Sequence, residues 1–217
     1  MPLYFLFLFF LLLFLFVLVE INVLTFAFAK LGLSPEAGLT VLFAALAGSG
    51  INIPLYSVRA QRPPQPPPLP PEFGLWRRPP MPFTGRTVIA VNLGGCVIPV
   101  GLSLYLLHIH RIPGTEVLLA IALVAAVSYF TSRPVPGMGI AMPMFVAPLA
   151  AVLVALLLDR GQAAPLAYVG GTLGVLIGAD LLHLPVIPRL GAPIASIGGA
   201  GTFDGIFFTG VLAALLA

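Results

Sequence analysis

The chain has 217 residues, of which 59% are hydrophobic and only 8% are charged, and its formal net charge is +3 at pH 7. Soluble globular domains carry about 25% charged residues, so this composition, with a mean hydropathy of +1.10, excludes that class. The basic residues lie in loops and form no basic face with aromatic platforms, so we expect no nucleic-acid partner. The single cysteine, Cys96, excludes an intramolecular disulfide and a multi-cysteine metal site.

Long apolar segments predict an all-α, polytopic integral membrane protein in one membrane domain, 1–217. A helix of about 20 apolar residues matches the hydrocarbon thickness of a bilayer, and the runs are continuous rather than alternating, which favours helices over barrel strands. The seven predicted segments are 3–29, 35–50, 87–107, 116–132, 138–158, 163–184 and 201–217.

The first segment, 3–29, is predicted to be a membrane helix or anchor. It lacks the basic n-region and the cleavage site of a signal peptide, and its apolar run is too long for one. The second segment, 35–50, is short and ends in the sequence GSGINIP, so we expect it to be broken or re-entrant.

Residues 51–86 form a long hydrophilic segment rich in proline, which favours extended polyproline II over a packed domain. We interpret it as a semi-rigid cytoplasmic loop, with a docking site for a partner or for lipid head groups as the alternative. Trp76 beside Arg77 and Arg78 fits an interfacial anchor.

Loop charge predicts the orientation in a cytoplasmic membrane. If loop 51–86 lies inside, then 133–137 and 185–200 lie inside too, and the basic residues divide seven against three. The inside set is Arg59, Arg62, Arg77, Arg78, Arg86, Arg133 and Arg189, and the outside set is Lys30, Arg111 and Arg160. The N-terminus is then cytoplasmic and the C-terminus external.

Ionisable residues within the bilayer are costly, so each is a functional hypothesis. The ionisable candidates are Glu20, Asp180, His183 and Asp204, and the neutral polar ones are Asn22, Asn52 and Asn92.

Asp180 follows a ladder of three glycines, Gly170, Gly174 and Gly178, which share one helix face. Such a small-xxx-small pattern lets another helix approach closely, so we expect the ladder to be a packing surface. Asp180 lies about 200° around the helix from Gly178, and we expect it to face another neighbour or a cavity. A hydrogen bond to His183, three residues on, is the structural alternative.

Asp204 follows Gly198, Gly199 and Gly201, which permit a tight turn into the last segment. With Thr202 as the N-cap, Asp204 would lie in the first helical turn, where the helix dipole favours negative charge. A simple helix-start acid is therefore the alternative to a catalytic role.

The two aspartates lie near the same end of consecutive helices joined by a short connection, so we expect them to meet at the cytoplasmic side. Two close carboxylates that share one proton can supply both the acid and the base that peptide hydrolysis needs. The dipoles suit Asp204 as the base and Asp180 as the acid.

The sequence GAGTFDGIFFTGVLAALLA resembles the glycine-x-glycine-aspartate helix of presenilin-type and signal-peptide-peptidase-type intramembrane aspartyl proteases. GADLLHL is similar to the helix that carries their first aspartate. The resemblance implies that Asp180 and Asp204 form a catalytic dyad, with Gly199, Gly201 and His183 shaping the backbone or the substrate site. It implies hydrolysis of membrane-embedded peptides with no cofactor beyond water.

A broader resemblance covers most of the chain. The sequences GSGINIPL, VNLGGCVIP, RPVPGMGIAMP, GADLLHL and GGAGTFDGIFFTG together resemble a family of uncharacterised bacterial and archaeal multi-pass membrane proteins.

Two other function classes stay open, with membrane lipids as the shared partner. An ion- or proton-coupled carrier would use broken helices and a polar path through Glu20, Asn52 and Asn92. A non-catalytic scaffold would use the aspartates to hold helices together. A site-2-type metalloprotease is disfavoured because the three histidines, His108, His110 and His183, do not supply the spacing of its metal ligands.

Overall fold

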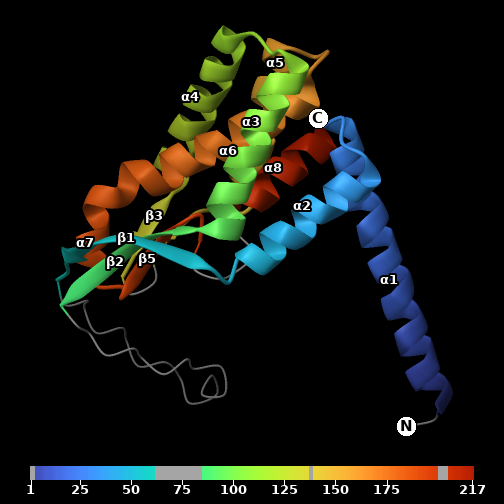
Figure 1. Ribbon diagram of the computed structural model, residues 1–217, viewed down its shortest axis with the longest axis horizontal. Helices are drawn as coiled ribbons and strands as arrows, with labels where there is room; N and C mark the ends of the chain where they lie inside the picture. The colour runs from blue at the N-terminus through green and yellow to red at the C-terminus, as the bar shows by residue number, and fades with distance from the viewer. Residues whose placement is uncertain (1–2, 62–84, 137–138, 200–204) are drawn as a thin grey trace.

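Apolar stretches form the helices of this computed structural model, which describes residues 3–61, 85–136, 139–199 and 205–217 (Figure 1). The helices are α1 (Leu3–Lys30), α2 (Pro35–Gly48), α3 (Ile98–His110), α4 (Gly114–Thr131), α5 (Val146–Leu158), α6 (Ala163–Val175), α7 (Ile187–Leu190) and α8 (Gly205–Leu216). From α6 to α7 the helical path continues through a π-helical turn, Leu176–Asp180, and a 3-10 helix, Leu181–Val186. The predicted helical class is confirmed.

Four helical stretches among the described residues are long and apolar enough to cross a membrane: Leu8–Lys30, Leu93–His110, Gly114–Thr131 and Ala163–Leu190. The chain is therefore a membrane protein. Helices α2 and α5 are apolar but shorter. The 14 residues of α2 rise only about 21 Å, less than a hydrocarbon core of about 30 Å. The count of seven spans thus stays a prediction.

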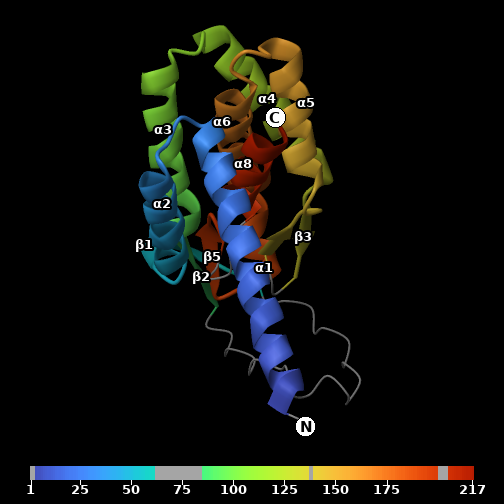
Figure 2. The ribbon, with the colours of Figure 1, turned by 90° about the vertical axis from the view of Figure 1, so that its right-hand side faces the viewer.

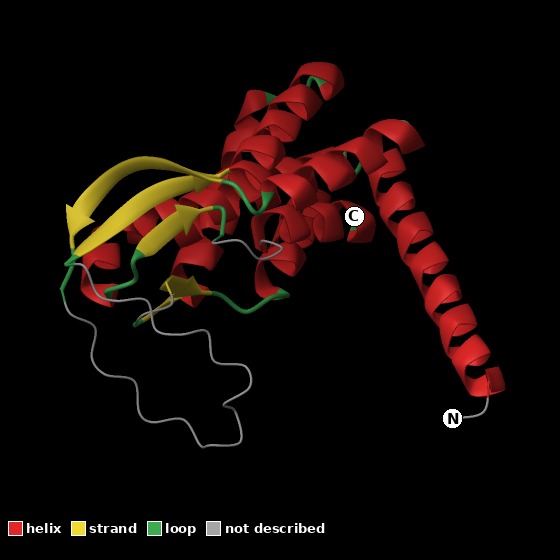
Figure 3. Ribbon diagram, turned by 60° about the horizontal axis from the view of Figure 1, so that its bottom comes forward, coloured by secondary structure: helices red, strands yellow, loops and turns green. Residues whose placement is uncertain are grey.

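Two small sheets lie at one end of the helices (Figure 3). The first has the order β1 (Asn52–Arg59), β2 (Arg86–Asn92), β5 (Ile194–Ile197), with β1 antiparallel and β5 parallel to β2. The second is the hairpin of β3 (Arg133–Val135) and β4 (Gly139–Ala141). The sequence did not lead us to expect strands at 52–59 or 86–92, which we placed in the loop and at the start of the third segment. The polyproline stretch, 62–84, lies outside the described residues.

Helix α6 lies at the centre of the bundle, and nearly all its side chains are buried (Figure 1). Its glycine ladder faces α4: an ideal Cβ on Gly170 would lie 2.9 Å from the Cβ of Ala120, and one on Gly174 would lie 2.7 Å from the Cβ of Val124. A Cβ on Gly178 would overlap the carbonyl oxygen of Ala125. The predicted packing role of the ladder is confirmed.

Helix α8 packs on another part of α6. An ideal Cβ on Gly210 would lie 2.8 Å from the ring of Tyr168, and one on Gly171 would lie 3.3 Å from the methyl group of Thr209. The helix that leads to Asp180 and the last helix are therefore neighbours, as we predicted from their short connection.

Different elements lie at the two ends of the helix bundle. The connections between α3 and α4 and between α5 and α6 lie at one end, and the sheets with α7 lie at the other (Figure 2). The end of α1 meets the end of α8, where the ammonium group of Lys30 donates a hydrogen bond of 2.9 Å to the carbonyl oxygen of Leu215.

Candidate functional site

Asp180 is the last residue of the π-helical turn that follows α6. Its Oδ2 accepts a hydrogen bond of 2.7 Å from the backbone N–H of Gly198. This hydrogen bond holds one carboxylate oxygen of Asp180 against the turn that follows β5.

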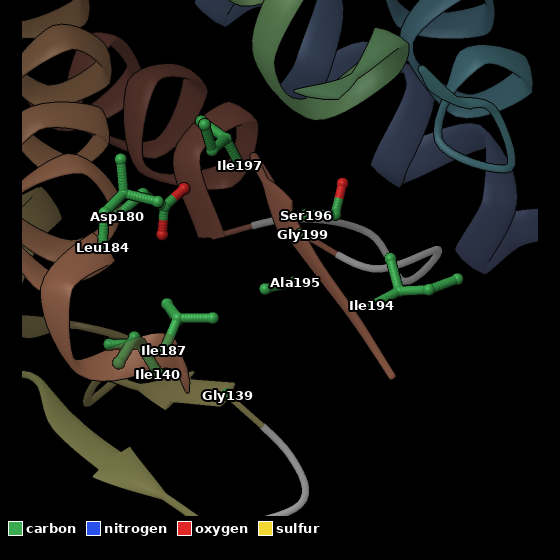
Figure 4. Close-up of a pocket in the computed structure, with 10 residues that line it drawn as sticks. All are labelled: Gly139, Ile140, Asp180, Leu184, Ile187, Ile194, Ala195, Ser196, Ile197 and Gly199. Carbon is green, nitrogen blue, oxygen red and sulfur yellow. The ribbon is translucent and has the colours of Figure 1, made fainter. Parts of the chain in front are cut away.

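A pocket of about 140 Å³ lies beside this carboxylate. The carboxylate points from its helix toward β5, while Ile187 reaches in from α7 and Ile140 lies on β4 (Figure 4). The lining residues are Gly139, Ile140, Asp180, Leu184, Ile187, Ile194, Ala195, Ser196, Ile197 and Gly199. The pocket therefore combines one carboxylate with walls of branched aliphatic side chains.

The floor of the site is a tight turn of two glycines. Gly198 and Gly199 have φ values of +86° and +91°, a region that disfavours side chains. The N–H of Gly199 donates to the carbonyl oxygen of Ser196 at 3.1 Å. Gly199 also lines the pocket. The predicted role of Gly199 in shaping the entry to the last helix stays a prediction, since residues 200–204 lie outside the described part of the chain.

Asn52 and Asn92, the two asparagines of the proposed polar path, belong to a hydrogen-bond network within the sheet of β1, β2 and β5. Asn92 is buried, and its amide group donates to the carbonyl oxygen of Ser49 at 2.7 Å and to Oδ1 of Asn52 at 3.1 Å. The hydroxyl of Ser196 donates to the same oxygen of Asn52 at 2.5 Å. Asn92 Oδ1 in turn accepts from the N–H of Gly95 at 2.7 Å. This network fixes β1, β2 and β5 together just before the Gly198 turn.

His183 is not among the described residues that line the pocket, and its contacts are with Gly178 and Tyr129. Its Nδ1 lies 3.1 Å from the carbonyl oxygen of Gly178, so Nδ1 carries the proton that is donated. The imidazole stacks on Tyr129 with 4.8 Å between the ring centroids. The hydrogen bond between Asp180 and His183 that we considered is not formed, since each side chain has a different partner.

Three other predicted site residues, Asp204, Gly201 and Glu20, are not among the described residues that line the pocket beside Asp180. Asp204 and Gly201 lie outside the described residues, and α8 begins at Gly205. Glu20 lies on an exposed stretch of α1 that stands apart from the sheets (Figure 1). Within the described part of the chain, no three His, Cys, Asp or Glu residues gather in a way that would hold a metal ion.

Sequence reasoning missed Ser196 and the aliphatic walls of the pocket. The segment APIASIGG, 192–199, has a short run, 194–197, between Pro193 and the two glycines, and such bounds are a signal of a short strand before a turn. We treated it only as the connection between the aspartates.

The comparison with protein families covers most of this structure. The model of a family described as proteins of unknown function, DUF1614, matches residues 46–216. The chain belongs to the DUF1614 family. The DUF1614 match includes the sheets, the pocket, Asp180 and Asp204, whereas Glu20 and α1 precede it. No curated protein and no solved structure matches the chain.

Proposed function

We propose that this DUF1614 protein is an intramembrane aspartyl-protease-like enzyme that hydrolyses peptide bonds of membrane-embedded substrates. The observation that carries the proposal is the hydrogen bond from Gly198 to Asp180 at the edge of a pocket. Gly198 begins the glycine-rich segment that leads, six residues later, to Asp204. The packing of α8 on α6 supports the same arrangement, because it holds the helices that follow and precede this segment side by side.

The proposed chemistry needs only water and the two carboxyl groups. One carboxylate, Asp204, takes a proton from a water molecule whose oxygen attacks the scissile carbonyl carbon, while the carboxyl group of Asp180 protonates the carbonyl oxygen. The resulting gem-diol returns a proton to Asp180 as the C–N bond breaks, and the leaving nitrogen takes the proton from Asp204. The products are a carboxylic acid and an amine, and the dyad regains its single shared proton.

The carrier alternative has less support. Its polar path requires Glu20, Asn52 and Asn92 to line one route. The two asparagines hydrogen-bond with each other and with protein groups, whereas Glu20 lies on the exposed stretch of α1.

Seven spans, a cytoplasmic membrane and a cytoplasmic N-terminus complete the proposal. The described parts of the loops that we assign to the inside, 51–61, 133–136 and 185–199, belong to the end of the bundle that carries the sheets and α7 (Figure 2). A dyad at this end would face the cytoplasmic side.

The test uses the purified full chain in lipid vesicles with a panel of transmembrane peptides, and mass spectrometry to locate the cut. We expect Asp180→Asn and Asp204→Asn each to lower the cleavage rate about 10²–10⁴-fold, because each removes an acid or base. Asparagine at 180 retains the Oδ1 acceptor for the Gly198 N–H, so folding should persist.

The matched control is Asp159→Asn, in the connection between α5 and α6, where Asp159 Oδ1 accepts from the N–H of Gly161 at 2.8 Å. This variant should cleave at the wild-type rate. Cleavage that survives both dyad substitutions, or no cleavage of any peptide by the wild-type protein, would overturn the proposal.

A further inference from the structure

The walls of the pocket have a chemistry that the catalytic proposal does not use. Its described lining includes five branched aliphatic side chains, from β4, the 3-10 helix, α7 and β5: Ile140, Leu184, Ile187, Ile194 and Ile197. Ile187 and Ile197 are buried, so their positions are fixed by packing. The aliphatic side of the pocket favours an apolar group, because a charged or polar group placed against these side chains would lose its hydration without gaining partners there.

Polar surface also contributes to the lining, and its described residues include two polar side chains, Asp180 and Ser196. The Ser196 hydroxyl donates to Asn52 and not into the pocket. Among the lining residues that the structure describes, Asp180 is the one with a charged side chain. A ligand would therefore place its reacting polar group at Asp180 and an apolar group between the aliphatic walls.

The volume of the pocket indicates the size of the group that it holds. An engineered apolar cavity of about 150 Å³ holds one benzene molecule, so a pocket of about 140 Å³ accepts a side chain of up to about that size. Valine, leucine and isoleucine fit, whereas tryptophan does not. Ala195 lies on the β5 wall, facing the space between Asp180 and Ile187 (Figure 4), where a larger side chain would fill the pocket.

We infer that this pocket is a specificity site, which selects substrates that carry valine, leucine or isoleucine next to the scissile bond. The inference rests on the proposed protease function and names its substrate class. Ile140 sets the size of the pocket from β4, and Ala195 sets it from β5.

The test compares peptides that differ only at the residue on each side of the mapped cut: alanine, valine, leucine, phenylalanine, tryptophan, aspartate and lysine. The wild-type protein should prefer valine and leucine by kcat/KM. Ile140→Ala should raise kcat/KM for phenylalanine relative to valine by at least about tenfold, since one methylene in such a pocket changes selectivity about 10–200-fold. Ala195→Val should lower kcat/KM for leucine relative to alanine by about the same factor.

Two matched variants act as controls. Ile53→Ala changes an exposed isoleucine of β1, and Ala141→Val changes an exposed alanine of β4 that does not line the pocket. Neither should alter the preference. The opposite directions expected for Ile140→Ala and Ala195→Val separate a change in pocket size from a general loss of folding, which would lower all rates together.

The outcomes separate the two proposals. If peptides are cut in an Asp180-dependent manner but the preference is unchanged in both pocket variants, the specificity site is wrong and the protease function stands. If no peptide is cut in an Asp180-dependent manner, the protease function fails and the specificity inference fails with it.

Discussion

Gly198 is the residue on which the position of Asp180 depends. Its N–H holds Oδ2 of the carboxylate, and its φ of +86° requires the left-handed region. An ideal Cβ on Gly198 would lie 2.7 Å from both the Cβ and the backbone nitrogen of Cys96. Glycine is therefore required at position 198 both by the backbone conformation and by the close approach of Cys96.

Gly198→Ala should destabilise the protein by clearly more than a left-handed alanine alone, which costs about 1–2 kcal/mol. The added methyl group must displace the π-helical turn Leu93–Val97 or move the Gly198 N–H away from Asp180. Chemical unfolding in detergent measures the free energy of unfolding. The matched variant is Gly85→Ala, at φ +75° with nothing within 4 Å of its Cβ. Equal losses in the two variants would show that the contact with Cys96 has no energetic importance.

At the scale of single residues, the sequence predicted part of the candidate site. The glycines before Asp204 indicated a tight turn, and Gly198 and Gly199 form one. The sequence did not predict that the N–H of Gly198 would bind Asp180, because a hydrogen bond between residues 18 positions apart depends on how α6 and β5 pack. His183 shows the reverse case, since its proximity in sequence to Asp180 suggested a partner that it does not have.

At the scale of elements, α6 organises the bundle because small residues let α4 approach closely and let α8 pack beside it. Contacts of this kind are driven by van der Waals packing, since lipid offers no hydrophobic gain on burial. The glycines of the ladder are thus stabilising through the space they leave, although glycine is a poor helix former.

Gly174→Ala should therefore destabilise the protein, because its Cβ would lie 2.7 Å from Val124 on α4. Gly101→Ala should have the opposite effect and raise the stability of the protein. Gly101 lies on an exposed face of α3 with nothing within 4 Å of its Cβ, so alanine there should stabilise the helix by about 0.5–1 kcal/mol. Thermal unfolding in detergent measures both. A stabilised Gly174→Ala variant would contradict the close packing of α4 on α6.

The helices followed from the sequence, and the strands did not. Residues 88–91, VIAV, continue directly into the apolar run that forms α3, and periodicity does not distinguish a short apolar strand from a buried helix. The preference of valine and isoleucine for strands was the available signal. Strand β5 was hidden for another reason: it has four residues, and it pairs with β2, which is about a hundred residues earlier in the chain.

At the scale of the whole molecule, the basic residues follow the two ends of the bundle. Arg59, Arg86, Arg133 and Arg189 belong to the strands and to α7, at the end with the sheets (Figures 1 and 2). Lys30 ends α1, and Arg111 and Arg160 lie in connections between helices. The described basic residues that the charge rule assigns to the inside thus lie at one end of the fold.

Cysteine labelling in intact bacterial cells tests this orientation. A thiol reagent that does not cross membranes should label Thr115→Cys, an exposed position at the start of α4, without permeabilisation. Ser57→Cys, an exposed position in β1, should react only after the membrane is opened, because the positive-inside rule places the sheets in the cytoplasm. Cys96 is buried, so the unmodified protein provides a low background. The reverse labelling pattern would show the opposite orientation in the membrane, with the Asp180 pocket on the external side. Labelling of both positions in intact cells would contradict the separation of the two ends by the membrane.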